Sequence, residues 1–151
     1  MSVTVADLLA RHRRVALDSN VLIYLFEGSS AEAEGAAAIL DAVESGLVEA
    51  TFATVGLAEV LTRPAQLDQT PLFERYAAEL TGFDNLRLVS LTPELAVDAA
   101  WARGQGQRDL PDAIHLASAR AAGATAFVTN DRRIRSRPGL EVVYLNEVLR
   151  A

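Results

Sequence analysis

The sequence predicts an α/β fold, a three-layer sandwich with a central, mainly parallel sheet of five strands. Short apolar runs alternate along the chain with longer segments that favour helix. Strands separated by helices need crossover connections, which place parallel strands side by side and helices on both faces. The 151 residues contain no internal repeat and no linker, so we expect one domain over residues 1–151.

The first half of the chain contains two of the expected strands. The elements are a strand at 14–18, a helical turn at 21–26, a helix at 31–45, a strand at 47–53 and a helix from 54 to about 62. Ser29, with Glu32 three residues later, resembles a capping box for the second of these helices. Thr54 can cap the third, and Pro64 is expected to end it.

The second half continues the alternation. Its expected elements are a helix from 70 towards 80, a strand at 86–90, a helix from 93 to about 103, a helix at 111–122, and strands at 124–129 and 141–145. Thr70 and Thr92 each precede a proline, which is typical of a helix start. Asp109 or a neighbour starts the helix at 111–122, and Gly123 suits its end.

Composition excludes several classes of function. The chain has no cysteine, which excludes disulfides, zinc–thiolate sites and cysteine nucleophiles. No apolar run approaches the ~20 residues that span a bilayer, and no signal peptide is apparent, so we expect a cytoplasmic protein with no membrane partner. A net charge of −6 argues against nucleic-acid binding by bulk charge, although a bound metal reverses the sign locally. All 14 basic residues are arginine, which disfavours receiver domains and haloacid-dehalogenase-type phosphatases because both normally need a site lysine.

Four acidic residues lie beside apolar segments. Asp18 and Asp131 follow predicted strands, and α/β sheets bind ligands at the edge where such strands end. Asp112 lies in the first turn of a helix that leads back to this edge, and Glu59 lies in the helix after the second strand. Four ionised carboxylates together are unfavourable without protonation or cations, and Mg²⁺ or Mn²⁺ would remove that penalty. Such a metal activates water and holds a scissile phosphate.

Each acid also has an ordinary structural interpretation. Asp18 and Asp112 suit helix starts, Asp131 suits a turn, and Glu59 can pair with an arginine one turn later. We interpret His115, three residues after Asp112, as a packed and hydrogen-bonded residue rather than a base or ligand. The combination of acids favours a metal site more than any single one does.

Four segments, in order, resemble the PIN-domain ribonucleases, and most closely the VapC-type toxins of bacterial toxin–antitoxin pairs. They are residues 17–23, 54–61, 110–119 and 123–131. The family's order of Asp, Glu, Asp and Asp is met by Asp18, Glu59, Asp112 and Asp131, and the resemblance spans residues 15–145. Ile134 stands where many relatives carry an aromatic residue, a departure expected to affect packing more than chemistry.

The resemblance implies a metal-dependent endoribonuclease that acts on structured RNA and leaves a 5′-phosphate and a 3′-hydroxyl. It implies Mg²⁺ or Mn²⁺ held mainly by Asp18 and Asp112, with Asp131 in support, while Glu59 orients water or a second metal. It also implies a homodimer and a cognate antitoxin protein whose tail enters the acidic site.

Other residues near the acids are candidates for supporting roles. The side chains of Ser19, Asn20 and Thr129 are expected to hydrogen-bond the carboxylates or a metal-bound water, although capping and strand formation also explain them. Arg132 and Arg133 are candidate contacts for RNA phosphates, although a solvated loop has the same composition.

Two alternatives remain open at this point, and a third is disfavoured. The chain can be a PIN-fold RNA-processing nuclease that is not a toxin. It can be a non-cleaving PIN-fold module that binds RNA or protein, although the full set of four acids argues against this. An RNase H-like nuclease would begin with an antiparallel hairpin, whereas here a helix follows the first strand.

Overall fold

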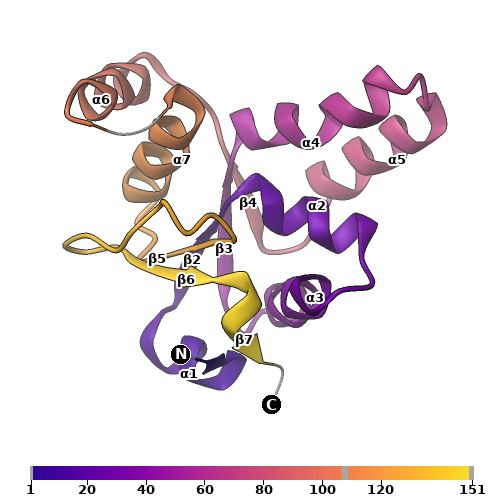
Figure 1. The fold of residues 1–151 in the computed structure, drawn as a ribbon, viewed down its shortest axis with the longest axis horizontal. Coiled ribbons are helices and arrows are strands. Elements are labelled where there is room, and N and C mark those ends of the chain that lie inside the picture. Colours follow the sequence, from indigo (N-terminus) through magenta and orange to yellow (C-terminus); the bar gives the residue numbers. More distant parts are fainter. Residues whose placement is uncertain (1, 107–108, 150–151) are drawn as a thin grey trace.

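The computed structural model describes residues 2–106 and 109–149 and confirms the predicted α/β class. The central sheet consists of β2 (Arg14–Leu17), β3 (Glu49–Ala53), β4 (Leu86–Val89), β5 (Ala126–Thr129) and β6 (Glu141–Tyr144). The strands lie in the order β4-β3-β2-β5-β6, and each neighbouring pair is parallel. The sheet is therefore parallel throughout rather than mainly so (Figure 1).

The central strand, β2, is the point from which the chain builds the sheet in both directions. The chain passes first to β3 and β4 on one side and later returns to β5 and β6 on the other. Ala16 of β2 lies between Thr51 of β3 and Phe127 of β5. The strand order thus reverses at the carboxyl ends of β2 and β5, the usual ligand position in such sheets.

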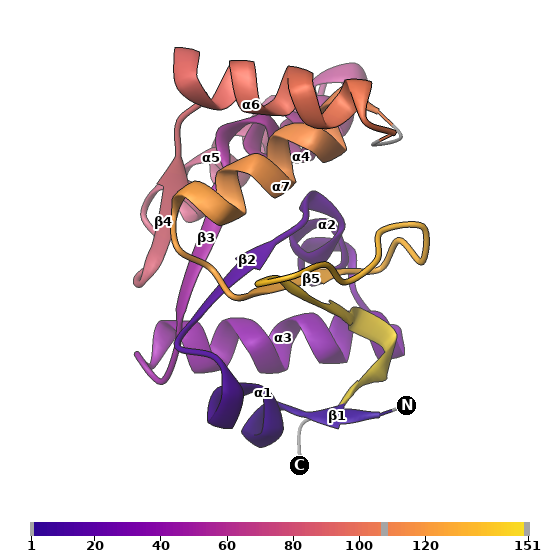
Figure 2. The ribbon, with the colours of Figure 1, turned by 90° about the vertical axis from the view of Figure 1, so that its left-hand side faces the viewer.

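Helices cover both faces of the sheet. They are α1 (Val5–Arg11), α2 (Ser19–Glu27), α3 (Ala31–Glu44), α4 (Thr54–Gln66), α5 (Thr70–Thr81), α6 (Pro93–Gly104) and α7 (Leu110–Ala121). Figure 2 shows α1 and α3 on one face and α6 and α7 on the other. In Figure 1, α4 and α5 form a hairpin on the side away from α6. The predicted three layers are present.

Alternation of side chains along the strands divides the core in two. Val15 and Leu17 pack with α3, whereas Ala16 packs with Leu116 of α7. In β5, Phe127 likewise belongs to the α7 side, while its two neighbours face α3. Because side chains of a strand point alternately to opposite faces, a fully buried parallel strand reads as a continuous apolar run.

Three predicted helix caps are displaced by one residue. Ser30, not Ser29, caps α3, and its hydroxyl accepts a hydrogen bond from Ala33 N at 3.2 Å. Thr54 and Thr70 are the first residues of α4 and α5 rather than their caps. The cap predicted at Thr92 is confirmed by its bond from the backbone of α6 at 3.2 Å.

Helix α4 continues past the proline that was predicted to end it. Pro64 lies in the last turn and is buried, and the helix ends at Gln66. A proline removes one intrahelical hydrogen bond. Near the end of a helix, few other hydrogen bonds depend on the missing one. The burial of the Pro64 ring therefore outweighs the lost hydrogen bond.

The N-terminal elements were not predicted. Thr4 caps α1 and shares a reciprocal capping box with Asp7. Strand β1 (Val3–Thr4) pairs in parallel with β7 (Val148–Leu149), which follows the short 3-10 helix η1 (Leu145–Glu147). Strands of two residues carry no periodicity that a sequence pattern could reveal.

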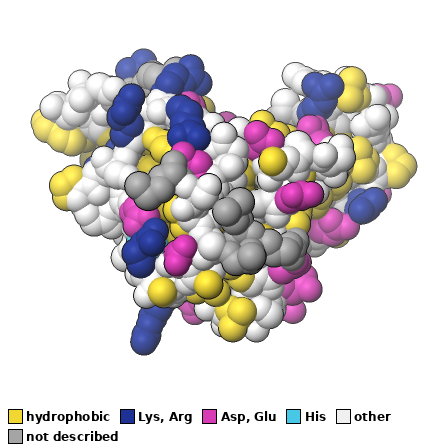
Figure 3. Space-filling model, turned by 60° about the horizontal axis from the view of Figure 1, so that its bottom comes forward, with side chains coloured by type: hydrophobic (Ala, Val, Ile, Leu, Met, Phe, Trp, Pro, Cys, Tyr) yellow, Lys and Arg dark blue, Asp and Glu magenta, His cyan; other side chains and the backbone are white. Residues whose placement is uncertain are grey.

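Charge is unevenly spread over the surface. On the face in Figure 3, arginines gather mainly on the side of α6 and α7, and acidic side chains predominate on the opposite side. The net charge of −6 therefore does not repel a polyanion from every part of this face. Within residues 2–106 and 109–149, no helix is both long and apolar enough to cross a membrane.

Candidate functional site

Asp18 is fixed at the carboxyl end of β2 by hydrogen bonds from three directions. It is the N-cap of α2, and Oδ1 accepts from Ser19 N at 2.8 Å. Oδ2 accepts from the Thr129 hydroxyl at 2.6 Å and lies 3.4 Å from Asn20 Nδ2. Asp18 is only 5% exposed, and its burial raises the pKa of its carboxyl group, against the opposing effect of nearby His115. The carboxylate is thus rigidly held although its surroundings disfavour its charge.

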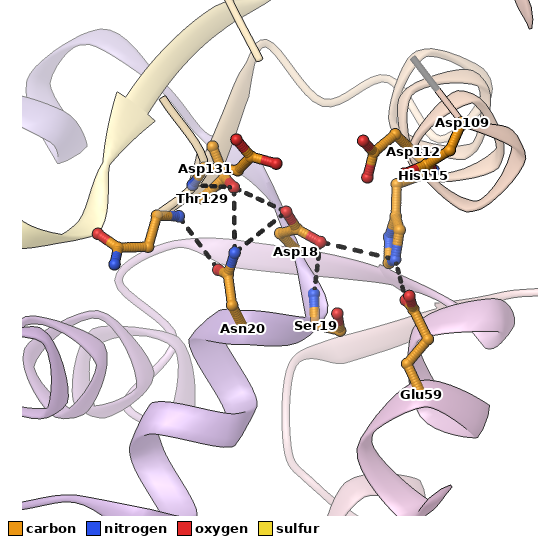
Figure 4. A network of polar contacts seen from close by, with 10 residues as sticks. Asp18, Ser19, Asn20, Glu59, Asp109, Asp112, His115, Thr129 and Asp131 are labelled. Atoms are coloured by element: carbon orange, nitrogen blue, oxygen red, sulfur yellow. Dashed lines mark hydrogen bonds and ion pairs between the residues drawn. The ribbon is translucent and has the colours of Figure 1, made fainter. Parts of the chain in front are cut away.

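The predicted supporting residues join the ends of β2 and β5. Asn20 Nδ2 lies 3.3 Å from Thr129 Oγ1, and Asn20 Oδ1 accepts from Asn130 N at 3.1 Å. Thr129 Oγ1 also accepts from Asp131 N at 3.0 Å (Figure 4). Ser19 contributes its backbone N–H to Asp18 rather than the side chain that was expected. These contacts orient the carboxylates by hydrogen bonding, as partners of metal ligands do.

Asp112 enters the site from the first turn of α7. The helix is capped by Asp109, whose Oδ1 accepts from Asp112 N at 2.9 Å. Burial, followed by the charges of Asp109, Asp18 and Asp131, raises the pKa of Asp112 from its ordinary value of 3.8 to about 6. Its Oδ2 is buried and has no hydrogen-bond partner. An unpartnered buried carboxylate oxygen beside other acids is an uncommon arrangement that a cation would satisfy.

Asp131 lies just beyond β5 and is already paired. Its Oδ1 accepts from Arg133 Nε at 2.9 Å and its Oδ2 from Arg133 Nη2 at 3.0 Å. Figure 4 shows Asp18, Asp112 and Asp131 around a shared space. Asp131 therefore reaches this space while it also holds Arg133, which fits a supporting position better than a principal one.

Glu59 approaches the site from α4 through a histidine. Its Oε1 accepts from His115 Nε2 at 2.8 Å, so Glu59 pairs with His115 and not with Arg63. The same nitrogen lies 3.7 Å from Asp18 Oδ1. Burial disfavours a charged imidazole, but the bond to Glu59 and the charges of Asp18, Glu59 and Asp112 outweigh it and raise the pKa of His115.

The donor set fits an oxygen-preferring cation, although no coordination shell is closed. Carboxylates from β2, α7 and the segment after β5 face one space, and one of their oxygens lacks a partner. Within the described residues, no three His, Asp or Glu side chains are close enough to hold a metal ion as they stand. Bare carboxylates repel one another, and a divalent cation would draw them together.

The two candidate RNA-binding arginines are engaged within the protein. Arg132 donates to Glu147 at 3.1 Å and to Asn146 at 2.8 Å, and its guanidinium stacks on Tyr144 at 4.3 Å. Arg133 holds Asp131. Both would have to exchange these partners for a phosphate, which weakens the prediction for Arg132 more because its pairing has no link to the acidic site.

Sequence reasoning underestimated two residues. His115 is packed and hydrogen-bonded, as expected, but its partner is a member of the site rather than a structural group. Asp109 was treated only as a helix start, yet its charge contributes to the raised pKa of Asp112. Spacing gave a signal for both, because residues three apart on a helix share a face.

A cluster of acidic residues at the switch point of a parallel sheet defines a class of site, and the comparisons with known proteins identify the family. The family model for the PIN domain matches residues 15–140, so the chain belongs to the PIN-domain family. A search of curated proteins gave no significant match.

Solved structures give the same fold. The chain is similar to VapBC2 from Rickettsia felis, solved with a promoter DNA fragment, with a TM-score of 0.67, 13% identity, and coverage of 87% of this chain and 98% of that one. It is also similar to FitAB bound to a DNA fragment, with a TM-score of 0.65, 18% identity, and coverage of 87% of this chain and 95% of that one. A third similar structure is VapC20 from Mycobacterium tuberculosis, described as a sarcin–ricin loop cleaving toxin. Its TM-score is 0.62 at 16% identity, and the match covers 75% of this chain and 86% of that one. At these identities the likeness shows the fold.

Proposed function

We propose that this protein is a metal-dependent endoribonuclease that uses Mg²⁺ or Mn²⁺. The observation that carries the proposal is the meeting of Asp18, Asp112 and Asp131 around one space, with a buried, unpartnered oxygen on Asp112. Membership of the PIN-domain family and the resemblance to PIN ribonucleases support it. Buried carboxylates of this kind need a cation to stay ionised together.

The residues of the chain divide the work of the proposed reaction. Asp18 and Asp112 hold the metal with support from Asp131, while Thr129 and Asn20 keep Asp18 in place. When bound there, the metal supplies Lewis acidity and an activated water for attack on a phosphodiester. Glu59, turned towards the site by His115, orients that water.

RNA cleavage by variants tests this proposal. Asp18→Asn and Asp112→Asn remove ligand charge with little change in shape, so cleavage of transfer and ribosomal RNA should fall to background. Asp98→Asn is the matched control, because Asp98 lies on the exposed side of α6. Equal cleavage by wild type in Mn²⁺ and in excess chelator would exclude the metal-dependent reaction.

We further propose that the nuclease is the toxin of a toxin–antitoxin pair, silenced by a cognate antitoxin protein. The structures similar to this chain include toxin–antitoxin complexes, which supports this partner. Induced expression should arrest growth, and coexpression of a small protein encoded beside the gene should restore it. Growth arrest that persists in Asp112→Asn would argue against RNA cleavage as its cause.

A homodimer is the assembly we propose. Val97 and Trp101 lie one turn apart on α6 and are 69% and 73% exposed, a large apolar area for a monomer to leave in water. Sedimentation should give a dimer for wild type, and Trp101→Ala should shift it towards monomer.

A non-cleaving module that binds RNA or protein is the alternative. It predicts RNA binding without cleavage in any divalent metal and no loss of binding in Asp112→Asn. The cleavage assay above therefore separates the two functions. A PIN-fold nuclease that is not a toxin would cleave RNA without arresting growth, so the growth assay distinguishes it from a toxin.

A further inference from the structure

His115 is buried between two of the site's acidic residues, Asp18 and Glu59. It lies one turn after Asp112 on α7 and is 2% exposed. The rings of Phe52 and Phe127 flank it, with centroids 6.2 and 6.3 Å away. The imidazole is therefore held in one orientation by packing on both sides.

The polar edge of this ring is directed at two carboxylates. Nε2 lies 2.8 Å from Glu59 Oε1 and 3.7 Å from Asp18 Oδ1, while Nδ1 is buried without a partner. Because both neighbours of Nε2 are acceptors, Nε2 carries the hydrogen whether the ring is neutral or charged. The ring thus acts as a fixed donor to the acidic site (Figure 4).

Gly56 provides the space that this ring needs. A Cβ at position 56 would lie 2.7 Å from His115 Cε1 and 2.5 Å from the ring of Phe52. Gly56 is the third residue of α4, and any larger residue there would place its Cβ against these two rings. The position of His115 is therefore fixed by packing against Gly56 and the two phenylalanine rings.

We propose that His115 is a positioning residue that keeps Glu59 bonded to the protein rather than to metal, so that the site holds a single divalent cation. This inference rests on the proposed metal-dependent function. It assigns Glu59 to the orientation of water and leaves Asp18, Asp112 and Asp131 as the ligands.

The geometry leaves no room for a second cation between Glu59 and Asp18. An ion shared by Glu59 and Asp18 would have to bind between Oε1 and Oδ1, where the Nε2–H group already lies. That group satisfies Glu59 with a short hydrogen bond and shields its charge from Asp18. A second ion would need the imidazole to leave its packed position between two phenylalanine rings.

Counting bound Mn²⁺ by electron paramagnetic resonance and calorimetry tests the inference. His115→Phe keeps a ring of similar size but removes the donor, and His115→Gln retains an N–H near the position of Nε2. His12→Gln is the matched control, because His12 is also buried but bonds Thr125 at 2.7 Å, at the opposite edge of the sheet. Melting curves show which variants fold, and kcat and KM on RNA are measured separately.

Wild type, His12→Gln and His115→Gln should each bind one Mn²⁺ per chain, whereas His115→Phe should bind two. In His115→Phe, kcat should fall by about 10- to 100-fold with little change in KM, as when the partner of a catalytic group is lost. Two Mn²⁺ per wild-type chain, or a His115→Phe variant that matches wild type in both stoichiometry and kcat, would overturn the inference.

Glu59→Ala tests the same point while the phenylalanine rings that flank His115 stay in place. If Glu59 is not a ligand, this variant should bind Mn²⁺ nearly as tightly as wild type, whereas Asp112→Ala should lose at least about tenfold in affinity. An equal loss in both variants would make Glu59 a ligand and overturn the inference, while the nuclease function would stand. A wild type that binds no Mn²⁺ would overturn the function as well.

Discussion

At the scale of single residues, Asp112 carries a charge that its surroundings disfavour. Its pKa of about 6 means that the folded protein binds a proton on this carboxyl more tightly than the unfolded chain does. Between about pH 4 and pH 6, Asp112 is therefore protonated more in the folded state than in the unfolded chain. Protonation of Asp112 favours the folded state, and this contribution to the free energy of unfolding is lost as pH rises through that window. At neutral pH the ionised Asp112 destabilises the metal-free protein.

Asp112→Asn should consequently raise the melting temperature of the metal-free protein at pH 7, because it removes a buried, repelled charge of the folded state. Mn²⁺ should raise the melting temperature of wild type, and the same variant should lose that rise. Thermal melts with Mn²⁺ and with chelator give both values. A variant that melts below wild type without metal would show that Asp112 stabilises the fold.

A substitution at Thr129 shows how strongly one hydroxyl contributes to holding Asp18 in place. Thr129→Val removes the 2.6 Å bond to Asp18 and should lower stability by about 1 to 3 kcal/mol. RNA cleavage should fall by about 10- to 100-fold. Thr125→Val is the matched control, since Thr125 precedes the same strand at the other edge and bonds His12. Equal effects of the two substitutions on cleavage would remove the positioning role.

At the scale of elements, two helices deliver the site from opposite directions. The N-terminus of α7 presents Asp112, and α4 presents Glu59 across a close contact with α7. Gly56 permits this contact because any side chain there would meet His115 and Phe52. The glycine thus serves helix packing at the expense of helix propensity.

A pair of glycine substitutions separates these two effects. Gly104→Ala, in α6 with no atom near its Cβ position, should be neutral or stabilising by up to ~1 kcal/mol. Gly56→Ala should instead destabilise by about 1 to 3 kcal/mol, because its Cβ would overlap two rings. Urea unfolding measures both, and a stabilised Gly56→Ala variant would show that the α4–α7 contact adapts freely.

Periodicity and local chemistry made most elements predictable. Continuous apolar runs identified β2 and β5, and Thr92 marked the start of α6 correctly. Caps failed where neighbouring residues offered the same chemistry, as at Ser29 and Ser30. The two-residue strands β1 and β7 depend on pairing between the ends of the chain, which no local pattern contains.

At the scale of the whole molecule, topology brings the acids together. The switch point between β2 and β5 places Asp18 beside Thr129, which are 111 positions apart in the chain. That meeting could be predicted, because the carboxyl ends of parallel strands share an edge. The contact of His115 with Glu59 could not, because it depends on how closely α4 and α7 approach.

The assembled site makes metal binding depend on pH. Under the proposed function, Mn²⁺ would bind the ionised carboxylates and would have to displace any proton on Asp112, whose pKa is about 6, and on Asp18, whose pKa is also raised. Apparent affinity should therefore be constant well above pH 6 and fall below it by about tenfold per pH unit for each displaced proton. Calorimetric titration across this range measures it, and affinity independent of pH would place the ligands elsewhere.

The most direct test is anomalous diffraction from crystals grown with Mn²⁺ at a concentration that supports RNA cleavage. We expect one Mn²⁺ in contact with the carboxylates of Asp18 and Asp112, close to Asp131 and separated from Glu59 by His115. A crevice without anomalous density under those conditions, or Mn²⁺ bound only elsewhere on the protein, would contradict it.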